Sequence, residues 1–386
     1  MQLSNPAGRR LLGRSLSAAL VGTLACSALS TAAFAGTAKV TEAHKVPTAA
    51  QLKKSLTALE AAPSGSVKLS ETGSSLFYPL FSVWAQRYPH SNVSIQTAST
   101  GSGTGQSGAL AGTASIGASD AYLPAGDPST LLNIPIVVSA QQINYNVPGV
   151  KGHIKLNASV INSMYTGAIT NWDDPAVKKL NPGLQIPPTP VVPIHRSDGS
   201  GDTFLFSSYL AAGDPGSFVA STGPNTTVNW PDVSSALAEK GNTGMLQTCA
   251  VTHGCIAYIG VSYLRNAIAS GLGYAAVENG KHNYELPGKG SIAAEIASYK
   301  NIPANGTISL IDSPKAAAGY PIVNFEYAIV QQHQPDPATA KAIVALLAWG
   351  MDSKGGAAPG FLLPINFQPL PANAEAVAIN QLKSIS

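Results

Sequence analysis

The sequence has 386 residues with 45% hydrophobic and 11% charged side chains, and its formal net charge is +3. Residues 1–35 contain three arginines and no acidic residue, so the rest of the chain has 20 basic and 20 acidic side chains. A neutral chain lacks the basic field that attracts nucleic acid or an anionic membrane, and we expect neither as a partner. The remaining length is too great for one ordinary hydrophobic core, which favours two lobes.

The N-terminus has the order of a secretory signal peptide. Three arginines stand within the first 14 residues, an apolar run covers 16–25, and the small-residue motif Ala33-Phe34-Ala35 follows. This order predicts a signal peptide over 1–35 and export to the periplasm or the extracellular side of the cell envelope. A lipid anchor at Cys26 is the less favoured alternative, and the paired arginines leave both ordinary and twin-arginine export open.

Residues 36–63 are rich in Ala, Thr, Lys and Pro and predict a flexible N-terminal linker with one weak helical pattern over 53–60. A strand is expected over 66–71, and apolar residues at helical spacing from Leu76 to Trp84 predict the next helix. Further strands are expected over 92–96, 114–118, 134–138, 143–147, 190–194 and 322–330, and further helices over 160–165, 339–349 and 374–385. This alternation predicts an α/β fold with two mainly parallel, helix-flanked sheets.

Three turns rich in Gly and Ser stand where an expected strand meets a helix. They are Gly73-Ser74-Ser75, Gly101-Ser102-Gly103-Thr104-Gly105 and Arg196-Ser197-Asp198-Gly199-Ser200-Gly201-Asp202. A helix N-terminus presents unpaired N–H groups and a partial positive charge, which suit an anion. Each turn alone is more often a plain helix cap. Three together, one with an arginine whose planar guanidinium fits a tetrahedral oxyanion, favour an anion site.

The second turn also begins the pattern G-x-G-x-x-G at Gly103–Gly108, which is typical of dinucleotide sites. The expected helix after it is too short for such a site, and the acidic residue in the right place, Asp120, lies in a tight turn. An exported protein also has no supply of a soluble nicotinamide cofactor. We therefore expect no dinucleotide and no other cofactor.

Asp120 ends the motif Gly117-Ala118-Ser119-Asp120. A buried carboxylate accepts a hydrogen bond from an oxyanion that carries a proton, such as phosphate, and repels one that carries none, such as sulfate. From the motif alone, a capping or surface aspartate would be the simpler interpretation.

Only two cysteines follow the signal segment, Cys249 and Cys255, with five residues between them. In an oxidising compartment this pair favours a disulfide over a metal or redox site, because no C-x-x-C or second pair accompanies it. The seven histidines have no metal-binding spacing, and no G-x-S-x-G motif is present. We therefore expect no metal and no catalytic residue.

Five motifs occur in order along the chain: Gly73-Ser74-Ser75-Leu76-Phe77-Tyr78-Pro79, Gly117-Ala118-Ser119-Asp120, Asn171-Trp172-Asp173-Asp174, Leu180-Asn181-Pro182-Gly183 and Arg196-Ser197-Asp198-Gly199-Ser200-Gly201. With them the chain, from about residue 66 to its end, resembles the periplasmic phosphate-binding proteins of bacterial phosphate ABC transporters. The resemblance implies a type II Venus-flytrap fold: two α/β lobes, two hinge strands, and phosphate in the cleft for delivery to the permease subunits. We expect lobe 1 over 64–140 plus 319–386, lobe 2 over 141–318, hinge strands near 140–145 and 316–320, and a monomer.

The resemblance also implies the phosphate-binding residues: Ser75, Leu76, Ser102, Asp120, Arg196, Ser200, Gly201 and Asp202. In this assignment Asp120 accepts the proton of the ligand, Arg196 is the cationic group, and Asp198 holds Arg196 by an ion pair. Asp202 departs from the threonine of many members, and an ionised carboxylate cannot donate a hydrogen bond. It either accepts a second proton of dihydrogen phosphate or caps the helix, and the sequence leaves both open.

Two other functions are weighed against phosphate capture. An exported phosphate-ester hydrolase would bind its substrate at the same Gly/Ser turns, but it needs a metal cluster or an activated nucleophile. A binder of another oxyanion, such as sulfate or molybdate, would bring no proton for Asp120.

Overall fold

The computed structural model describes residues 46–124 and 130–386. The signal peptide over 1–35, Cys26 and the start of the expected linker lie outside the described residues. The strands are β1 Val67–Gly73, β2 Val93–Ser99, β3 Ile116–Ser119, β4 Leu131–Tyr145, β5 Lys155–Leu156, β6 Val192–Arg196, β7 Leu237–Glu239, β8 Cys255–Gly260, β9 Gly273–Tyr274, β10 Ala276–Glu278, β11 Tyr284–Glu285 and β12 Val323–Gln331.

The α-helices are α1 Ala49–Leu59, α2 Tyr78–Arg87, α3 Ser102–Leu110, α4 Ala158–Tyr165, α5 Pro175–Leu180, α6 Gly201–Gly213, α7 Gly241–Val251, α8 Leu264–Ala269, α9 Lys289–Ala297, α10 Pro337–Met351, α11 Pro359–Leu362 and α12 Ala372–Leu382. Two short 3₁₀ helices cover Val261–Tyr263 and Leu363–Ile365. The expected α/β alternation is confirmed, because strands and helices fall within a few residues of most of the predicted ranges.

The main sheet contains two groups of parallel strands. The first strand group is β2-β1-β3 and the second strand group is β8-β6-β7. Strands β12 and β4 join the two groups and pair antiparallel with their neighbours. A separate small sheet has the order β11-β10-β5. Two parallel groups with helices against them are the α/β arrangement that the sequence predicts.

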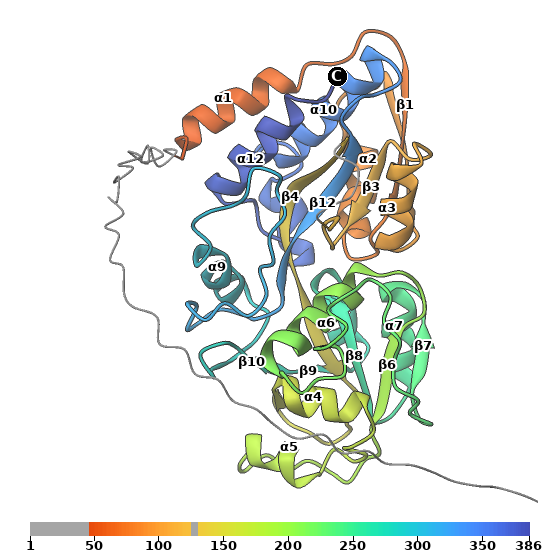
Figure 1. Cartoon of the computed structure of the whole chain (residues 1–386), viewed down its shortest axis with the longest axis vertical. Helices are drawn as coiled ribbons and strands as arrows, with labels where there is room; N and C mark the ends of the chain where they lie inside the picture. Colours follow the sequence, from red (N-terminus) through yellow and green to blue (C-terminus); the bar gives the residue numbers. More distant parts are fainter. Residues whose placement is uncertain (1–45, 125–129) are drawn as a thin grey trace, which may run out of the picture. The chain divides into compact units, whose positions relative to one another are not determined.

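Strand β4 corrects one prediction. The sequence predicts separate strands over 134–138 and 143–147, whereas β4 is one strand of 15 residues. Its residues 131–140 pair with β12 and its residues 141–145 pair with β8, so it passes from the first strand group to the second (Figure 1). The polar residues between the two apolar runs look like a break in sequence, but Ser139, Gln141 and Gln142 are fully buried within the strand.

Helix α1 corrects a second prediction, the flexible linker over 36–63. Its N-cap Thr48 and Gln51 form a capping box, which satisfies N–H groups at the helix start. Leu52 and Leu56, one turn apart, are 3% and 2% exposed, and α1 packs against α10 and α12. The described part of this segment is therefore largely an ordered helix, because one apolar stripe suffices to bind it to the core.

The core around the first strand group includes a set of aromatic rings. Phe77, Phe81 and Trp84 project from α2 and its start, and Trp84 meets Trp349 of α10 edge to face with ring centroids 6.0 Å apart. This packing holds α2, and with it the turn at Gly73–Ser75, against the sheet. The helical spacing predicted for this segment is confirmed, although α2 begins at Tyr78.

Candidate functional site

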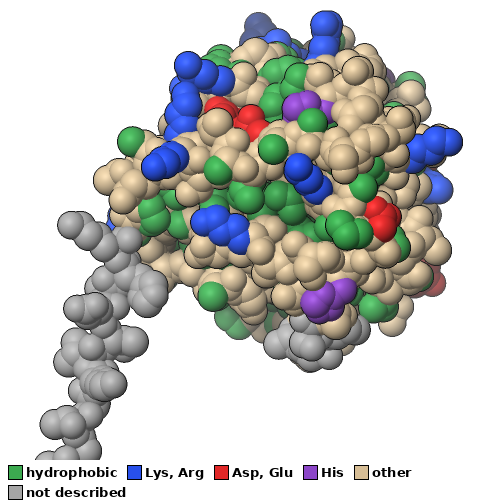
Figure 2. Space-filling view, turned by 90° about the horizontal axis from the view of Figure 1, so that it is seen from above, with side chains coloured by type: hydrophobic (Ala, Val, Ile, Leu, Met, Phe, Trp, Pro, Cys, Tyr) green, Lys and Arg blue, Asp and Glu red, His purple; other side chains and the backbone are tan. Residues whose placement is uncertain are grey.

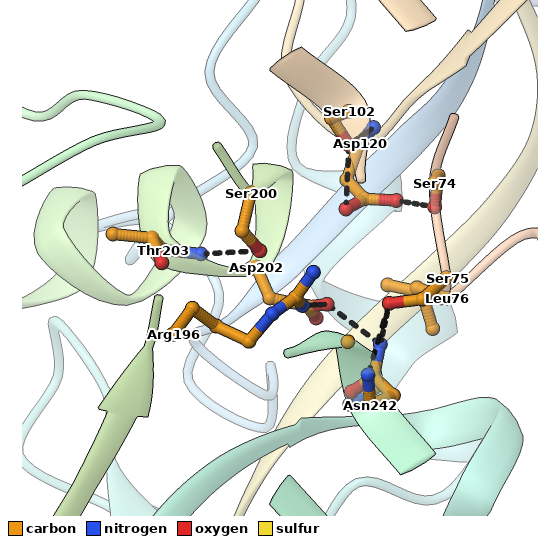
Figure 3. Close-up of polar contacts among 12 residues, drawn as sticks. Ser74, Ser75, Leu76, Ser102, Asp120, Arg196, Ser200, Asp202, Thr203 and Asn242 are labelled. Carbon is orange, nitrogen blue, oxygen red and sulfur yellow. Dashed lines mark hydrogen bonds and ion pairs between the residues drawn. The ribbon is translucent and has the colours of Figure 1, made fainter. Parts of the chain in front are cut away.

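The three Gly/Ser turns of the sequence come together at one place between the two strand groups (Figure 3). The first turn follows β1, the second begins α3, and the third connects β6 to α6. Gly103 N–H donates to the Gly199 carbonyl at 2.9 Å, and a Cβ on Gly201 would lie 2.6 Å from Ser102 Oγ and would overlap Asp120 Oδ2. Only glycine at position 201 permits this approach.

Around this contact lies a set of polar side chains that we call the polar cluster: Ser74, Ser75, Ser102, Asp120, Arg196, Asp198, Ser200, Asp202 and Asn242. Eight of these residues are buried, and Asp198 is half-buried. Burial of so many polar groups costs free energy unless each has a partner, so their hydrogen bonds show how the site is organised.

Asp120, a member of the polar cluster, is 2% exposed. Its Oδ1 accepts the hydroxyl of Ser74, and its Oδ2 accepts the hydroxyl of Ser102 at 3.1 Å. Burial raises its pKa, while hydrogen bonds and the charge of Arg196 act in the opposite direction. Asp120 is thus a buried acceptor held in place from two turns, and it is no helix cap.

Arg196 is 5% exposed and has its guanidinium bound by two aspartates. Nε and Nη2 donate to the two oxygens of Asp198 at 2.6 and 2.5 Å, and Nη1 donates to Asp202 Oδ2 at 2.9 Å. Burial lowers the pKa of Arg196, but the two carboxylates more than offset it and the net shift is upward. Although burial alone would raise it, hydrogen bonds and charge from Arg196 hold the pKa of Asp198 below its usual value.

Asp202 is fully buried and is not the cap of α6. The N-cap is Ser200, whose Oγ accepts from Thr203 N–H at 3.3 Å. The Asp202 carboxylate instead accepts from Arg196, from Asn242 Nδ2 at 2.7 Å and from Gln141 Nε2 at 3.2 Å. Burial first, then the charge of Asp120, raises its pKa to about 7, with Arg196 acting against the rise. The capping alternative is therefore wrong, and Asp202 is a partner of Arg196.

Ser75 and Leu76 lie where the first turn meets the second strand group. Ser75 Oγ accepts from the N–H of Asn242 at 3.1 Å and from its Nδ2 at 2.9 Å. The Leu76 carbonyl accepts from Ser262 Oγ at 2.8 Å, and its side chain lies against Gly260. The sequence-predicted residues from all three turns are thus brought together.

Three buried polar residues near the site are absent from the predicted ligand set, although one of them, Ser74, belongs to the first of the three turns. Asn242 binds Ser75 and Asp202 and also accepts from Gly260 N–H at 2.7 Å. Ser74 donates to Asp120, and Gln141 of β4 reaches Asp202. The one signal for Asn242 is the preceding Gly241, which has φ 65° and marks a fourth turn before a helix. The neighbouring Thr203 hydroxyl forms its hydrogen bond with the Tyr258 hydroxyl at 2.9 Å, outside the polar cluster.

The G-x-G-x-x-G pattern has a packing role. A Cβ on Gly117 of β3 would overlap the carbonyl of Gly105 in α3, so helix and strand approach within backbone contact. Gly103 meets Gly199 across the site, and Gly108 faces Ala114. Three close approaches account for these glycines without a dinucleotide.

Two features outside the site bear on the other sequence-based predictions. Cys249 and Cys255 form a disulfide between α7 and β8, as predicted. Among residues 46–124 and 130–386, no helix is both long and apolar enough to cross a membrane.

Figure 2 shows lysine and arginine side chains distributed over one face of the molecule among uncharged and hydrophobic ones. Arg196, by contrast, is a buried cation inside the polar cluster.

An α/β protein with two strand groups, two connecting strands and a polar cluster between the groups is a two-lobed solute-binding protein of the periplasmic type. The family model described as "PBP superfamily domain" matches residues 41–353. The chain is 31% identical over 329 residues to the phosphate-binding protein PstS of Methanocaldococcus jannaschii, with 78% of this chain and 82% of the relative covered. The chain therefore belongs to the PBP superfamily and, within it, to the phosphate-binding proteins.

Solved structures agree on the fold. A high-affinity periplasmic phosphate-binding protein called PfluDING, solved with phosphate, is similar at a TM-score of 0.64 and 20% identity, covering 80% of this chain and 92% of that one. An ABC-type phosphate transport receptor from Vibrio cholerae is similar at a TM-score of 0.50 and 16% identity, covering 78% of this chain and 100% of that one. The type II fold predicted from the sequence is confirmed.

Proposed function

We propose that this chain binds inorganic phosphate in the polar cluster and delivers it to an ABC-type importer. The relatives are named phosphate-binding proteins, and one similar structure is an ABC-type phosphate transport receptor. In this proposal lobe 1 covers 64–140 plus 319–386 and lobe 2 covers 141–318. The hinge lies at residues 140–145 of β4 and at 316–320, which the sequence predicts as a strand but which is irregular in the structure. The lobes close on the ligand by bending at these two hinge segments.

The observation that carries this proposal is Asp120, a fully buried acceptor whose two oxygens are already oriented by Ser74 and Ser102. Phosphate near neutral pH brings at least one proton for such an acceptor, while sulfate brings none. An unpaired buried carboxylate beside a sulfate oxygen would cost several kcal/mol. Selectivity for phosphate follows from this asymmetry.

The proposed ligand set is the one that the resemblance implies: Ser75, Leu76, Ser102, Asp120, Arg196, Ser200, Gly201 and Asp202. The positive charge of Arg196 is shared with Asp198 and Asp202, so it cannot neutralise a bound anion alone. Hydroxyl groups and the unpaired N–H groups at the start of α6 complete the ligand shell. Asp202, with a pKa of about 7 raised by burial and Asp120, gains a proton as the pH falls and then leaves Arg196 more charge for the ligand.

We further infer that the protein is a binding protein and no enzyme, that it acts as a monomer, and that it works in the periplasm or on the extracellular side. Export rests on the signal peptide predicted over 1–35. A lipid anchor at Cys26 stays the less favoured alternative. The expected partners are phosphate and the membrane permease subunits of the importer.

The test is calorimetric titration of the protein, stripped of ligand, with phosphate and then sulfate at pH 7. We expect one-to-one binding of phosphate and no heat with sulfate. Arg196→Ala is expected to weaken phosphate binding strongly, whereas Lys178→Ala, which removes an exposed cation, should leave it unchanged. Equal binding of both anions would favour the other-oxyanion alternative. Metal-independent hydrolysis of a chromogenic phosphate ester would favour the enzyme.

A further inference from the structure

A second buried carboxyl group lies directly behind Asp120. Strand β12 pairs antiparallel with β3, with Tyr327 opposite Ser119 and Ala328 opposite Ala118. The next step of this register places Glu326 opposite Asp120. Residues opposite each other in antiparallel strands have neighbouring side chains on one face, and the two carboxyl groups are within hydrogen-bonding reach of each other.

Glu326 is fully buried, and only one of its two carboxyl oxygens has hydrogen-bond donors. Its Oε1 accepts from the hydroxyl of Ser139 on β4 and from Asn324 Nδ2 at 3.2 Å. Its Oε2 has no donor among the described residues. On the β4 side it pairs with Val137, which offers no charge. Within the described chain no Lys, Arg or His forms an ion pair with it.

Buried acidic groups outnumber the cations around Glu326. Asp120, Asp202 and Glu326 are fully buried acids, and Arg196 is the cation next to them, already bound by Asp198 and Asp202. Two carboxylates in contact without a cation between them do not both ionise. Burial first, and then the charge of Asp120, raises the pKa of Glu326 well above its usual value.

We propose that Glu326 keeps its proton at neutral pH and donates it from Oε2 to Asp120, so that the pair carries one negative charge and Asp120 stays an ionised acceptor. Glu326 is then a positioning residue for ligand specificity. This inference rests on the proposed function, because it concerns the acceptor of the phosphate proton.

The number of acceptor positions on Asp120 explains what this hydrogen bond does. A carboxylate has about four lone-pair positions. Ser74 occupies one, Ser102 occupies one, and the proton of Glu326 occupies a third. One position remains for one P–OH group. Without the donor, Asp120 takes up a proton more readily and becomes a donor itself, and a donor also accommodates sulfate.

The protonation state of Glu326 is tested directly by the electrophoretic charge of the ligand-free full chain at pH 7. Glu326→Gln replaces the acid by a neutral group of the same shape and is expected to co-migrate with the wild type. Asp232→Asn, which removes an exposed carboxylate, is the matched control and should shift mobility by one charge. A one-charge shift for Glu326→Gln would overturn the proposal.

Anion titrations test the donor role. Glu326→Gln retains an N–H donor and should keep the preference for phosphate over sulfate within about threefold. Glu326→Met retains the bulk but has no donor, and the preference should fall about tenfold at pH 6, because loss of the donor raises the pKa of Asp120. An unchanged preference in Glu326→Met would show that the residue only fills space. If Glu326→Met does not fold, the electrophoretic result on Glu326→Gln decides by itself.

Phosphate binding by the protein and the protonated state of Glu326 can be refuted by different results. If the wild-type protein binds no phosphate, the proposed function fails whatever the charge of Glu326. If the wild type binds phosphate but Glu326→Gln binds it more than tenfold tighter, Glu326 was an ionised repelling charge, and only the present inference fails.

Discussion

At the scale of single residues, the site consists of acids whose protonation is set by their neighbours. Asp198 and Asp202 share one cation, Arg196, while Asp120 has serine hydroxyls and a neighbouring glutamate. If every carboxyl were ionised, the cluster would repel a phosphate dianion. The raised pKa values of Asp202 and Glu326 instead allow these two acids to keep protons, so that fewer negative charges oppose an anion.

Asp120→Asn is expected to relax discrimination against sulfate. The asparagine amide can donate to a sulfate oxygen, whereas the carboxylate cannot, so the phosphate-to-sulfate affinity ratio should fall by at least about a hundredfold, or roughly 3 kcal/mol. Calorimetric titration with both anions measures the ratio. Asp232→Asn serves as the control. A variant that still excludes sulfate would show that another group is the filter.

Asp202→Asn is expected to change how stability depends on pH. Because the pKa of Asp202 is raised to about 7 by burial and Asp120, between about pH 4 and 7 the folded protein holds a proton that the unfolded chain releases. This contribution to the free energy of unfolding is present in acid and is lost as the pH rises to about 7.

Denaturant unfolding of wild type and Asp202→Asn at several pH values measures this effect. The variant should lose less stability than the wild type on going from pH 4 to pH 7. If the free energies of unfolding of the two proteins change with pH in parallel, Asp202 remains ionised across this range because the attraction of Arg196 outweighs the effect of burial on its pKa.

At the scale of elements, α6 begins at the polar cluster with a glycine. Gly201→Ala adds a Cβ that would overlap Asp120 Oδ2 and lie 2.6 Å from Ser102 Oγ. We expect phosphate affinity to fall at least a hundredfold, about 2.7 kcal/mol. The free energy of unfolding without ligand should fall as well, because the added Cβ meets the same atoms of Asp120 and Ser102 when no ligand is bound.

Gly290→Ala is the matched control for this prediction. It also lies in the first turn of a helix, α9, and a Cβ there meets nothing within 4 Å. Isothermal titration of both variants measures the affinities. Wild-type affinity in Gly201→Ala would show that the two strand groups need not approach this closely when phosphate is bound.

Helix α1 gives a second prediction at this scale. Leu56, 2% exposed, anchors α1 against the rest of the protein. Leu56→Ala should lower the free energy of unfolding by about 2–5 kcal/mol and leave phosphate affinity unchanged, since α1 lies outside the polar cluster. Urea unfolding with and without phosphate tests this. A loss of less than 0.5 kcal/mol would mean that α1 behaves as the flexible linker that its sequence predicts.

At the scale of the whole molecule, a phosphate bound in the polar cluster would contact both strand groups and should stabilise them together. At phosphate concentrations a thousandfold above Kd, the free energy of unfolding should rise by about 4 kcal/mol. Thermal unfolding should show one transition that moves upward with phosphate and stays fixed with sulfate. Two transitions, of which phosphate moves only one, would show that the ligand binds a single lobe.

Sequence by itself determined the features that depend on local pattern. Apolar periodicity and Gly/Ser turns located most strands and helices, the two cysteines indicated their disulfide, and the ordered motifs indicated the family. The turns of Asp120 and Arg196 were expected in one site because of the resemblance to the phosphate-binding proteins, since they follow strands of two different parallel groups.

Only the tertiary structure decided which polar groups meet. Ser139 and Gln141 look like a strand break, yet burial within β4 makes them partners of Glu326 and Asp202. In the sequence, Glu326 is a polar residue within an apolar strand and has no evident role. The register of β12 and β3 places it opposite Asp120. Asp202 fits two roles in sequence, and its contact with Arg196 excludes the cap. The physical reason is that hydrogen bonding and desolvation depend on neighbours distant in the chain, which local sequence patterns do not specify.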